Sequence, residues 1–155
     1  MRRNQRGFSL IELLIVVAVI LIIAAIAIPS FIRSRERSNE ASAVSSLHTI
    51  NTACVTYSSL YNGYPALLSN LGPAAVATSS AADLLDSLLA AGHKSGYNLT
   101  YTPGAVSGGT IQTYTITADP LNRGVTGERG FFTDQSFVIR FDPSATATVS
   151  SSPLQ

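Results

Sequence analysis

A single carboxylate interrupts the most apolar part of this chain. Phe8–Ile28 is a run of 21 residues in which Glu12 is the only charged residue and Ser9 the only other polar one. A carboxylate within hydrocarbon costs a few kcal/mol, so Glu12 has two interpretations. It lies about 6 Å into the run, one helical turn, from where its side chain could reach lipid head groups. Alternatively, it pairs with a positive group.

Cleavage of the chain between Gly7 and Phe8 would create that positive group, a new α-amino group on Phe8. The amine could belong to the same chain or to a neighbouring chain that docks alongside. In the second case Glu12 would set the register between the two helices, because a slip of one turn would leave a charge unpaired in lipid.

Oxygen-bearing side chains form the second candidate site. They crowd one connection near the C-terminus and could hold Ca²⁺: Asp119, Asn122, Glu128 and Asp134. The spacing is not that of an EF-hand, and Asp before proline and Asn near glycine are also ordinary turn signals. We therefore assign no metal and no other cofactor, and calcium remains the alternative.

Nothing in the sequence predicts an enzyme. His48 has no second ligand or acid partner nearby, Cys54 is the only cysteine and so excludes a disulfide, and no catalytic or phosphate-binding motif is present. The net charge is +1 and three of the ten Lys and Arg lie in residues 1–7, which carry no acid, so the remainder has a net charge of −2. Bulk binding of nucleic acid is therefore not expected.

The apolar run is long enough, at about 30 Å as a helix, to cross a bilayer. An ordinary signal peptide has a shorter apolar core and a small-residue cleavage site after it, whereas Pro29 and Ser30 are followed here by bulky and basic residues. A plain single-pass anchor and an anchor that is cleaved before the apolar run both remain.

Residues 6–20, Arg-Gly-Phe-Ser-Leu-Ile-Glu-Leu-Leu-Ile-Val-Val-Ala-Val-Ile, resemble the N-terminus of type IV prepilins and type II secretion pseudopilins. The likeness covers about residues 1–31. It implies cleavage between Gly7 and Phe8 by a prepilin peptidase, N-methylation of Phe8, and a role for Glu12 in assembly of a helical filament. Pro29 looks like the helix-kinking proline of that family.

The resemblance implies a structural subunit, a pilin or pseudopilin, of a type IV pilus-like filament. Its partners would be identical or homologous pilin subunits, the prepilin peptidase and an inner-membrane assembly platform. The subunit would wait in the inner membrane as a single-pass protein, N-terminus inside, and then join a periplasmic or extracellular filament. Arginines flank the run on both sides, so the positive-inside rule alone leaves the orientation undecided.

The alternative is a minor tip pilin or a membrane-tethered binding protein that captures a ligand such as DNA or a surface polymer. The sequence does not choose between motility, secretion, DNA uptake and adhesion. Many type IV pilins close a C-terminal loop with a disulfide, which a chain with one cysteine cannot do, and this favours pseudopilins or disulfide-free pilins.

We expect an α+β, pilin-like fold, in which a long N-terminal helix packs on a small antiparallel sheet of three or four strands with a short inserted helix. The segments are a leader (1–7), a transmembrane and assembly helix (8–30), its amphipathic continuation (31–61), a globular head (62–143) and a flexible tail (144–155). Apolar side chains spaced three or four residues apart predict the buried face of the continuation: Val44, Leu47, Ile50, Cys54, Tyr57 and Tyr61.

In the head we expect a helical turn within 65–73 and a helix over 81–91 that Ser80 caps. Alternating polar and apolar residues predict strands at 97–102 and 112–118. A hairpin of 131–133 and 137–141 turns at 134–136. Residues 104–109 should form a flexible loop, and the tail should fray.

Overall fold

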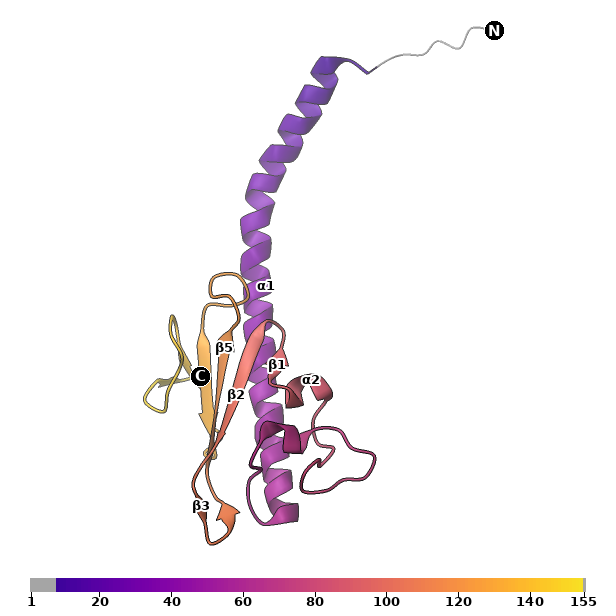
Figure 1. Cartoon of the computed structure of the whole chain (residues 1–155). Coiled ribbons are helices and arrows are strands. Elements are labelled where there is room, and N and C mark those ends of the chain that lie inside the picture. Colours follow the sequence, from indigo (N-terminus) through magenta and orange to yellow (C-terminus); the bar gives the residue numbers. More distant parts are fainter. Residues whose placement is uncertain (1–7, 155) are drawn as a thin grey trace, which may run out of the picture. The chain divides into compact units, whose positions relative to one another are not determined.

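A single helix, α1 (Leu10–Tyr61), contains the apolar run from its third residue onward, together with the amphipathic continuation. The computed structural model describes residues 8–154. These fall into two compact units, and the boundary in the sequence lies between Ser34 and Arg35. Each unit is described by itself below, and Figure 1 gives the order of the elements along the chain.

The N-terminal unit, from residue 8 to 34, is helical from Leu10 onward. Its leucines, isoleucines and valines are exposed on every side, as expected of a helix whose surroundings are apolar. Within the described residues, α1 is the one helix long and apolar enough to cross a membrane. Pro29 lies inside α1. Because proline cannot donate a backbone hydrogen bond to the preceding turn, it favours a kink, and the predicted kink stays a prediction.

The C-terminal unit, from Arg35 onward, combines the rest of α1 with an antiparallel sheet (Figure 1). Six strands follow the order β1-β2-β5-β6-β7-β8. Their bounds are β1 (His93–Lys94), β2 (Tyr97–Pro103), β5 (Tyr114–Pro120), β6 (Gly130–Asp134), β7 (Arg140–Asp142) and β8 (Ser152–Pro153). A separate hairpin and two short helices complete the unit: β3 (Val106–Ser107), β4 (Thr110–Ile111), η1 (Leu68–Leu71) and α2 (Ser87–Ala90).

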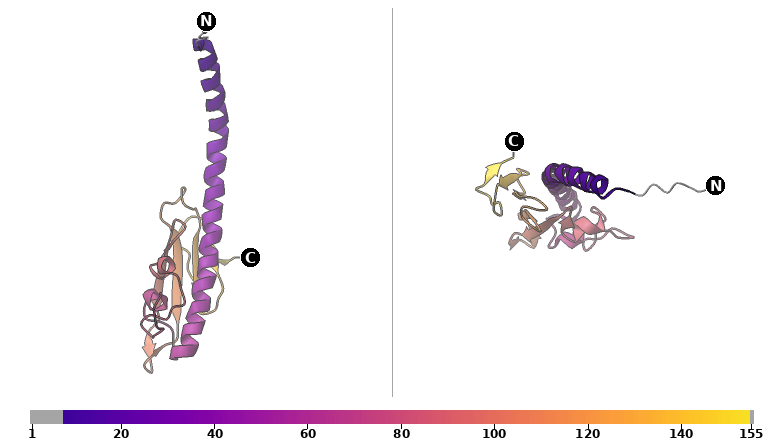
Figure 2. Two further views of the ribbon diagram at one scale, coloured as in Figure 1. Left: turned by 90° about the vertical axis from the view of Figure 1, so that its right-hand side faces the viewer. Right: turned by 90° about the horizontal axis from the view of Figure 1, so that it is seen from above.

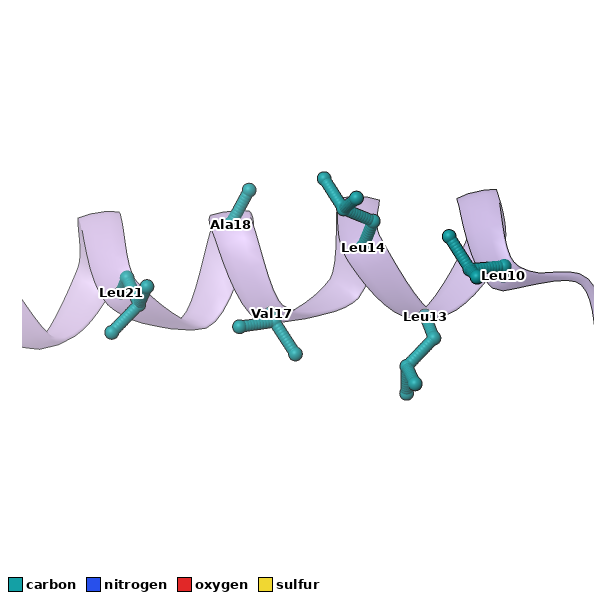
Figure 3. Close-up of a pocket in the computed structure, with 6 residues that line it drawn as sticks. All are labelled: Leu10, Leu13, Leu14, Val17, Ala18 and Leu21. Carbon is teal, nitrogen blue, oxygen red and sulfur yellow. The ribbon is translucent and has the colours of Figure 1, made fainter.

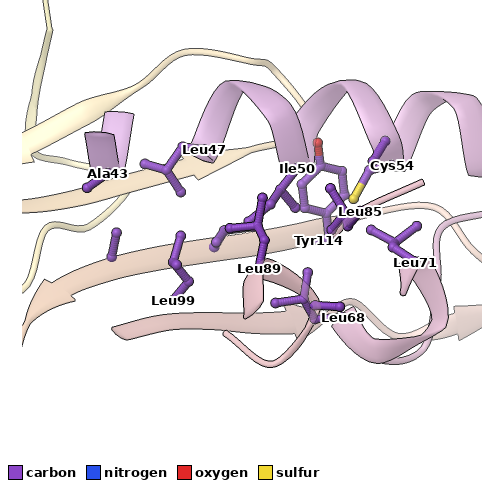
Figure 4. Close-up of a cluster of buried hydrophobic side chains, with 14 of the residues drawn as sticks. Ala43, Leu47, Ile50, Cys54, Leu68, Leu71, Leu85, Leu89, Leu99 and Tyr114 are labelled. Carbon is purple, nitrogen blue, oxygen red and sulfur yellow. The ribbon is translucent and has the colours of Figure 1, made fainter. Parts of the chain in front are cut away.

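One face of α1 packs on the sheet within this unit, as Figure 2 shows from two further sides. The predicted stripe is confirmed: Leu47, Ile50 and Cys54 are fully buried, and Val44 and Tyr61 pack at its edge. These side chains meet residues of β2, β5 and the η1–α2 region in one core (Figure 4). The α+β architecture of a long helix on an antiparallel sheet is therefore as expected.

The polar residue Asn51 is buried in the same interface. Its amide nitrogen donates to Thr133 Oγ1 at 2.9 Å, and its amide oxygen accepts from the Tyr114 hydroxyl at 2.9 Å. Because both hydrogen bonds cross from α1 to the sheet, and a buried polar group without a partner is costly, they favour one register of the helix on β5 and β6.

The prediction of a helix over 81–91 with Ser80 as its cap is wrong in both the length and the capping residue. Only α2 is helical, and Asp86 caps it by accepting from the Leu89 amide at 2.8 Å, whereas Ser80 does not. The amides of residues 82–85 instead donate to carbonyl groups of Asn70, Leu71 and Gly72. Residues 82–85 therefore bond to η1 and the residue after it, and do not begin a helix. The turn η1 itself confirms the helical turn predicted within 65–73.

The strand predictions hold for β2, β5 and β6, but the sheet has six strands where three or four were expected. The last predicted strand begins at Arg140 and not at 137, because Phe137 has a φ of 66°, outside the strand region. Residues 104–109, expected as a loop, contribute β3 to a hairpin with β4.

The tail also differs from the fraying segment that we expected. β8 pairs with β7, and the Leu154 amide donates to the Ile139 carbonyl at 2.8 Å. Ala147 is only 1% exposed. A run of small polar residues has little burial signal of its own, so this docking was not visible in the sequence.

Candidate functional site

The start of α1 brings Glu12 and Ser9 together. The Ser9 amide donates to Glu12 Oε2 at 3.0 Å, and the Leu13 amide donates to the Ser9 carbonyl at 3.2 Å. Ser9 is therefore the N-cap residue and Glu12 the third helical residue, the positions of a capping box. We missed this contact in the sequence, although Ser-x-x-Glu before an apolar run is a known signal for it.

Phe8 lies before the helix, in non-helical backbone, and its side chain is 82% exposed. Gly7, on the other side of the predicted cleavage point, lies outside the described residues. Cleavage and methylation at this point therefore remain predictions, as does the pairing of Glu12 with an amine.

A continuous apolar stripe follows directly after the cap (Figure 3). It consists of side chains that recur at steps of three and four and line one shallow hollow along α1: Leu10, Leu13, Leu14, Val17, Ala18 and Leu21. The same spacing allows side chains of a second helix to fit between those of the first. The geometry at this end of the chain is thus an apolar helix with one carboxylate in its first turn.

The four calcium candidates are not brought together. Asp119 lies at the end of β5, whereas Asp134 pairs with Thr115, four residues away and so about 13 Å along the strand. Ligands of one Ca²⁺ lie within about 2.6 Å of the ion. Asp119 instead lies 3.4 Å from Arg123 Nη2. Among residues 8–154, no three His, Cys, Asp or Glu side chains are grouped to hold a metal ion.

A second carboxylate that we missed, Glu40, links α1 to the segment between β5 and β6. It is 6% exposed and accepts from the backbone amides of Glu128 and Arg129 at 3.1 Å each. The Arg129 guanidinium completes the contact at 2.8 Å and also packs near the rings of Phe131 and Phe141.

Two opposing effects act on the pKa of the Glu40 carboxyl. Burial raises it, but the hydrogen bonds from Arg129 and Glu128 favour the charged form more strongly, so the pKa lies below its ordinary value of 4.5. The carboxylate is therefore charged at neutral pH, and its contacts tie the β5–β6 connection to the helix.

Among residues 8–154, no catalytic arrangement of side chains surrounds Cys54 or His48. Cys54 is buried in the core, and burial raises the pKa of its thiol to about 12, so it packs as an apolar group. His48 lies on the exposed face of α1 among serine and threonine side chains. The surroundings of these two side chains do not support acid–base or nucleophilic chemistry.

Comparison with known proteins places the similarity at the same end of the chain. Residues 2–28 match the prokaryotic N-terminal methylation motif. The chain is 45% identical over 69 residues to the type IV major pilin protein PilA of Myxococcus xanthus, covering 44% of this chain and 31% of that protein. It is 28% identical over 72 residues to the type II secretion system core protein G of Dickeya chrysanthemi, covering 46% and 47%.

A third relative, the type IV wide pilus major component PilA4 of Thermus thermophilus, is 55% identical over 38 residues, which are 24% of this chain and 29% of that protein. The chain thus spans less than half the length of these relatives. It carries a prepilin-type N-terminal segment and is similar to both type IV pilins and type II secretion pseudopilins.

Proposed function

We propose that this protein is a structural subunit of a type IV pilus-like filament, processed at its N-terminus and assembled through α1. The observation that carries the proposal is an uncovered apolar helix with one carboxylate, Glu12, in its first turn, within a segment that matches the N-terminal methylation motif. Enzymatic activity does not form part of this function.

Before assembly, the subunit waits in the inner membrane as a single-pass protein with its N-terminus inside. A prepilin peptidase cleaves between Gly7 and Phe8, and the new amine of Phe8 is methylated. Because Phe8 and Ser9 precede the first helical residue, the bond to be cleaved adjoins non-helical chain, which a peptidase can bind.

During assembly, the apolar stripe of α1 leaves lipid and packs against the helices of identical or homologous subunits, at an inner-membrane platform. Lipid and protein are similarly apolar, so the hydrophobic effect contributes little, and helix packing sets the geometry. Glu12 pairs with the Phe8 amine of a neighbouring subunit, which selects one axial register because any other would leave both charges unpaired.

The heads, from Arg35 onward, then lie outside the helical core of the filament, in the periplasm or outside the cell. Their serine- and threonine-rich surface has few charges, consistent with the low charged content of 12%. The salt bridge between Glu40 and Arg129 and the two backbone hydrogen bonds to Glu40, together called the Glu40 clamp, hold the β5–β6 connection on α1 in each subunit.

The test is to express variants in the native host and to follow processing by intact mass and assembly by the yield of sheared filaments. Gly7→Leu should leave the leader uncleaved, because a bulky side chain replaces the small residue before the cleavage point. Glu12→Ala should be processed and methylated but should give at least about tenfold fewer filaments, since loss of a charge pair is worth more than about 1.4 kcal/mol in lipid.

Glu36→Ala is the matched control, because Glu36 is a second acid on α1 that has no salt bridge among the described residues. It should assemble like the unmodified protein. Normal filament yield from Glu12→Ala, or a mature protein that retains Met1, would refute the proposal.

A further inference from the structure

Glu12 has a partner within its own helix. Its Oε2 atom accepts from the Ser9 amide at 3.0 Å, and no partner for Oε1 is found among residues 8–154. The first amides of a helix have no carbonyl to donate to, and water cannot replace one within lipid. The carboxylate therefore satisfies a backbone donor at the helix end that would lie in or near hydrocarbon.

The capping contact also determines where the carboxylate points. The backbone nitrogen atoms of Phe8 and Ser9 are joined by three covalent bonds and lie no more than about 3.7 Å apart. A carboxylate held on the Ser9 amide consequently lies within about 7 Å of the nitrogen atom that cleavage would convert to the amine. The contact turns the Glu12 side chain back toward Ser9, at the N-terminal end of the helix.

We propose that the Ser9 amide is a positioning group for assembly, which holds Glu12 at the end of its helix and leaves Oε1 for an incoming amine. Glu12 is then a helix cap in the waiting subunit and a counter-charge in the filament. The role of Glu12 as a counter-charge rests on the proposed function, whereas its role as a helix cap does not depend on it.

Substitutions separate the two roles of Glu12. Glutamine at this position retains a carbonyl oxygen of the same reach and so keeps the cap, but it loses the charge. Alanine loses both. Aspartate keeps the charge on a side chain that is shorter by one methylene, so its capping contact depends on whether the carboxylate still reaches the Ser9 amide.

The first experiment measures hydrogen exchange of the Ser9 amide by NMR, with the full-length chain in detergent micelles. Exchange should be about tenfold slower in the unmodified chain and in Glu12→Gln than in Glu12→Ala, as expected for a hydrogen bond to a side-chain acceptor. Glu36→Ala, with its substitution in a later turn of α1, should match the unmodified chain. Equal exchange in all four proteins would overturn the cap.

The second experiment compares filament yield with this exchange rate for Glu12→Asp. If the cap positions the charge, the Glu12→Asp protein should assemble when its Ser9 amide is protected and fail to assemble when it is not. A protein that assembles normally with an unprotected amide, or fails with a protected one, would overturn the positioning role.

Failure of the inference and failure of the proposed function give different results. Normal filaments from both Glu12→Gln and Glu12→Ala would remove the charge pair from the mechanism, whatever the exchange rate of Ser9. Defective filaments from both, together with an unprotected Ser9 amide in the unmodified chain, would retain the charge pair and reject the cap.

Discussion

Two carboxylates on α1, those of Glu12 and Glu40, accept hydrogen bonds from backbone amides. They differ in how many groups hold them and in how far away in the chain those groups lie. Among residues 8–154, Glu12 has one hydrogen-bond donor, the Ser9 amide, at the first turn of the helix. Glu40 is held by two amides and a guanidinium from a segment 88 and 89 residues away in the chain. In the proposed assembly the Glu12 carboxylate changes partner, whereas the Glu40 carboxylate is part of the fold of the head.

The position of Glu40 predicts a dependence of head stability on pH. Its pKa is lower in the folded protein than in the unfolded chain, so its contribution is fully present above about pH 4.5 and is lost as the pH falls through the folded value. We expect Glu40→Gln to lower the free energy of unfolding at pH 7 by about 1–3 kcal/mol, and the loss to shrink on acidification. Urea unfolding followed by near-UV circular dichroism at several pH values would measure both effects.

Glu36→Gln provides the control for this prediction, since Glu36 has no salt bridge among the described residues. It should unfold at the same urea concentration as the unmodified protein across the pH range. A Glu40→Gln protein whose stability and pH profile match those of the control would show that the clamp adds nothing to the fold.

At the scale of elements, the tail is part of the sheet and not an appendage. Ala147 is 1% exposed, whereas Val149, two residues on, is 62% exposed. We expect Ala147→Asp to destabilise the head by about 2 kcal/mol or more, because it buries an unpaired polar group, and Val149→Asp to have almost no effect. Thermal unfolding of the two variants would compare the positions, and equal, unchanged midpoints would show that the tail does not dock.

The β5–β6 connection gives a prediction about calcium. Two of the candidate ligands, Asp119 and Asp134, are separated by about 13 Å along β5, and Asp119 already faces Arg123. We therefore expect the unfolding temperature to be the same, within about 1 °C, in millimolar CaCl₂ and in excess chelator. A rise of several degrees with CaCl₂ that MgCl₂ does not reproduce would mean that these oxygen atoms do gather around the ion.

At the scale of the whole molecule, the chain consists of two units that require different solvents. The hydrophobic core is built from residues 43 and beyond, and the described residues before Arg35 are uncovered and almost entirely apolar. We expect a protein that begins at Arg35 to be water-soluble and to unfold cooperatively, with a midpoint within a few degrees of that of the full chain in detergent. A truncated protein without a cooperative transition would mean that the head needs the apolar segment to fold.

The sequence by itself determined the features that depend on neighbouring residues. The apolar run, its lone Glu12, the periodic stripe from Val44 to Tyr61, and the alternation in β2 and β5 are all patterns that extend over fewer than about 25 residues. Such patterns reflect which face of one element is buried, so they can be recognised without the rest of the molecule.

Only the tertiary structure decided the features whose partners are distant in sequence. The true start of α2 depends on carbonyl groups of Asn70, Leu71 and Gly72 that accept from residues 82–85. The role of Glu40, the buried Asn51, the docked tail and the separation of Asp119 from Asp134 likewise depend on which strands pair and in which register. A polar residue does not reveal through its neighbours whether a distant partner will satisfy it, because that partner is selected by the packing of the complete fold.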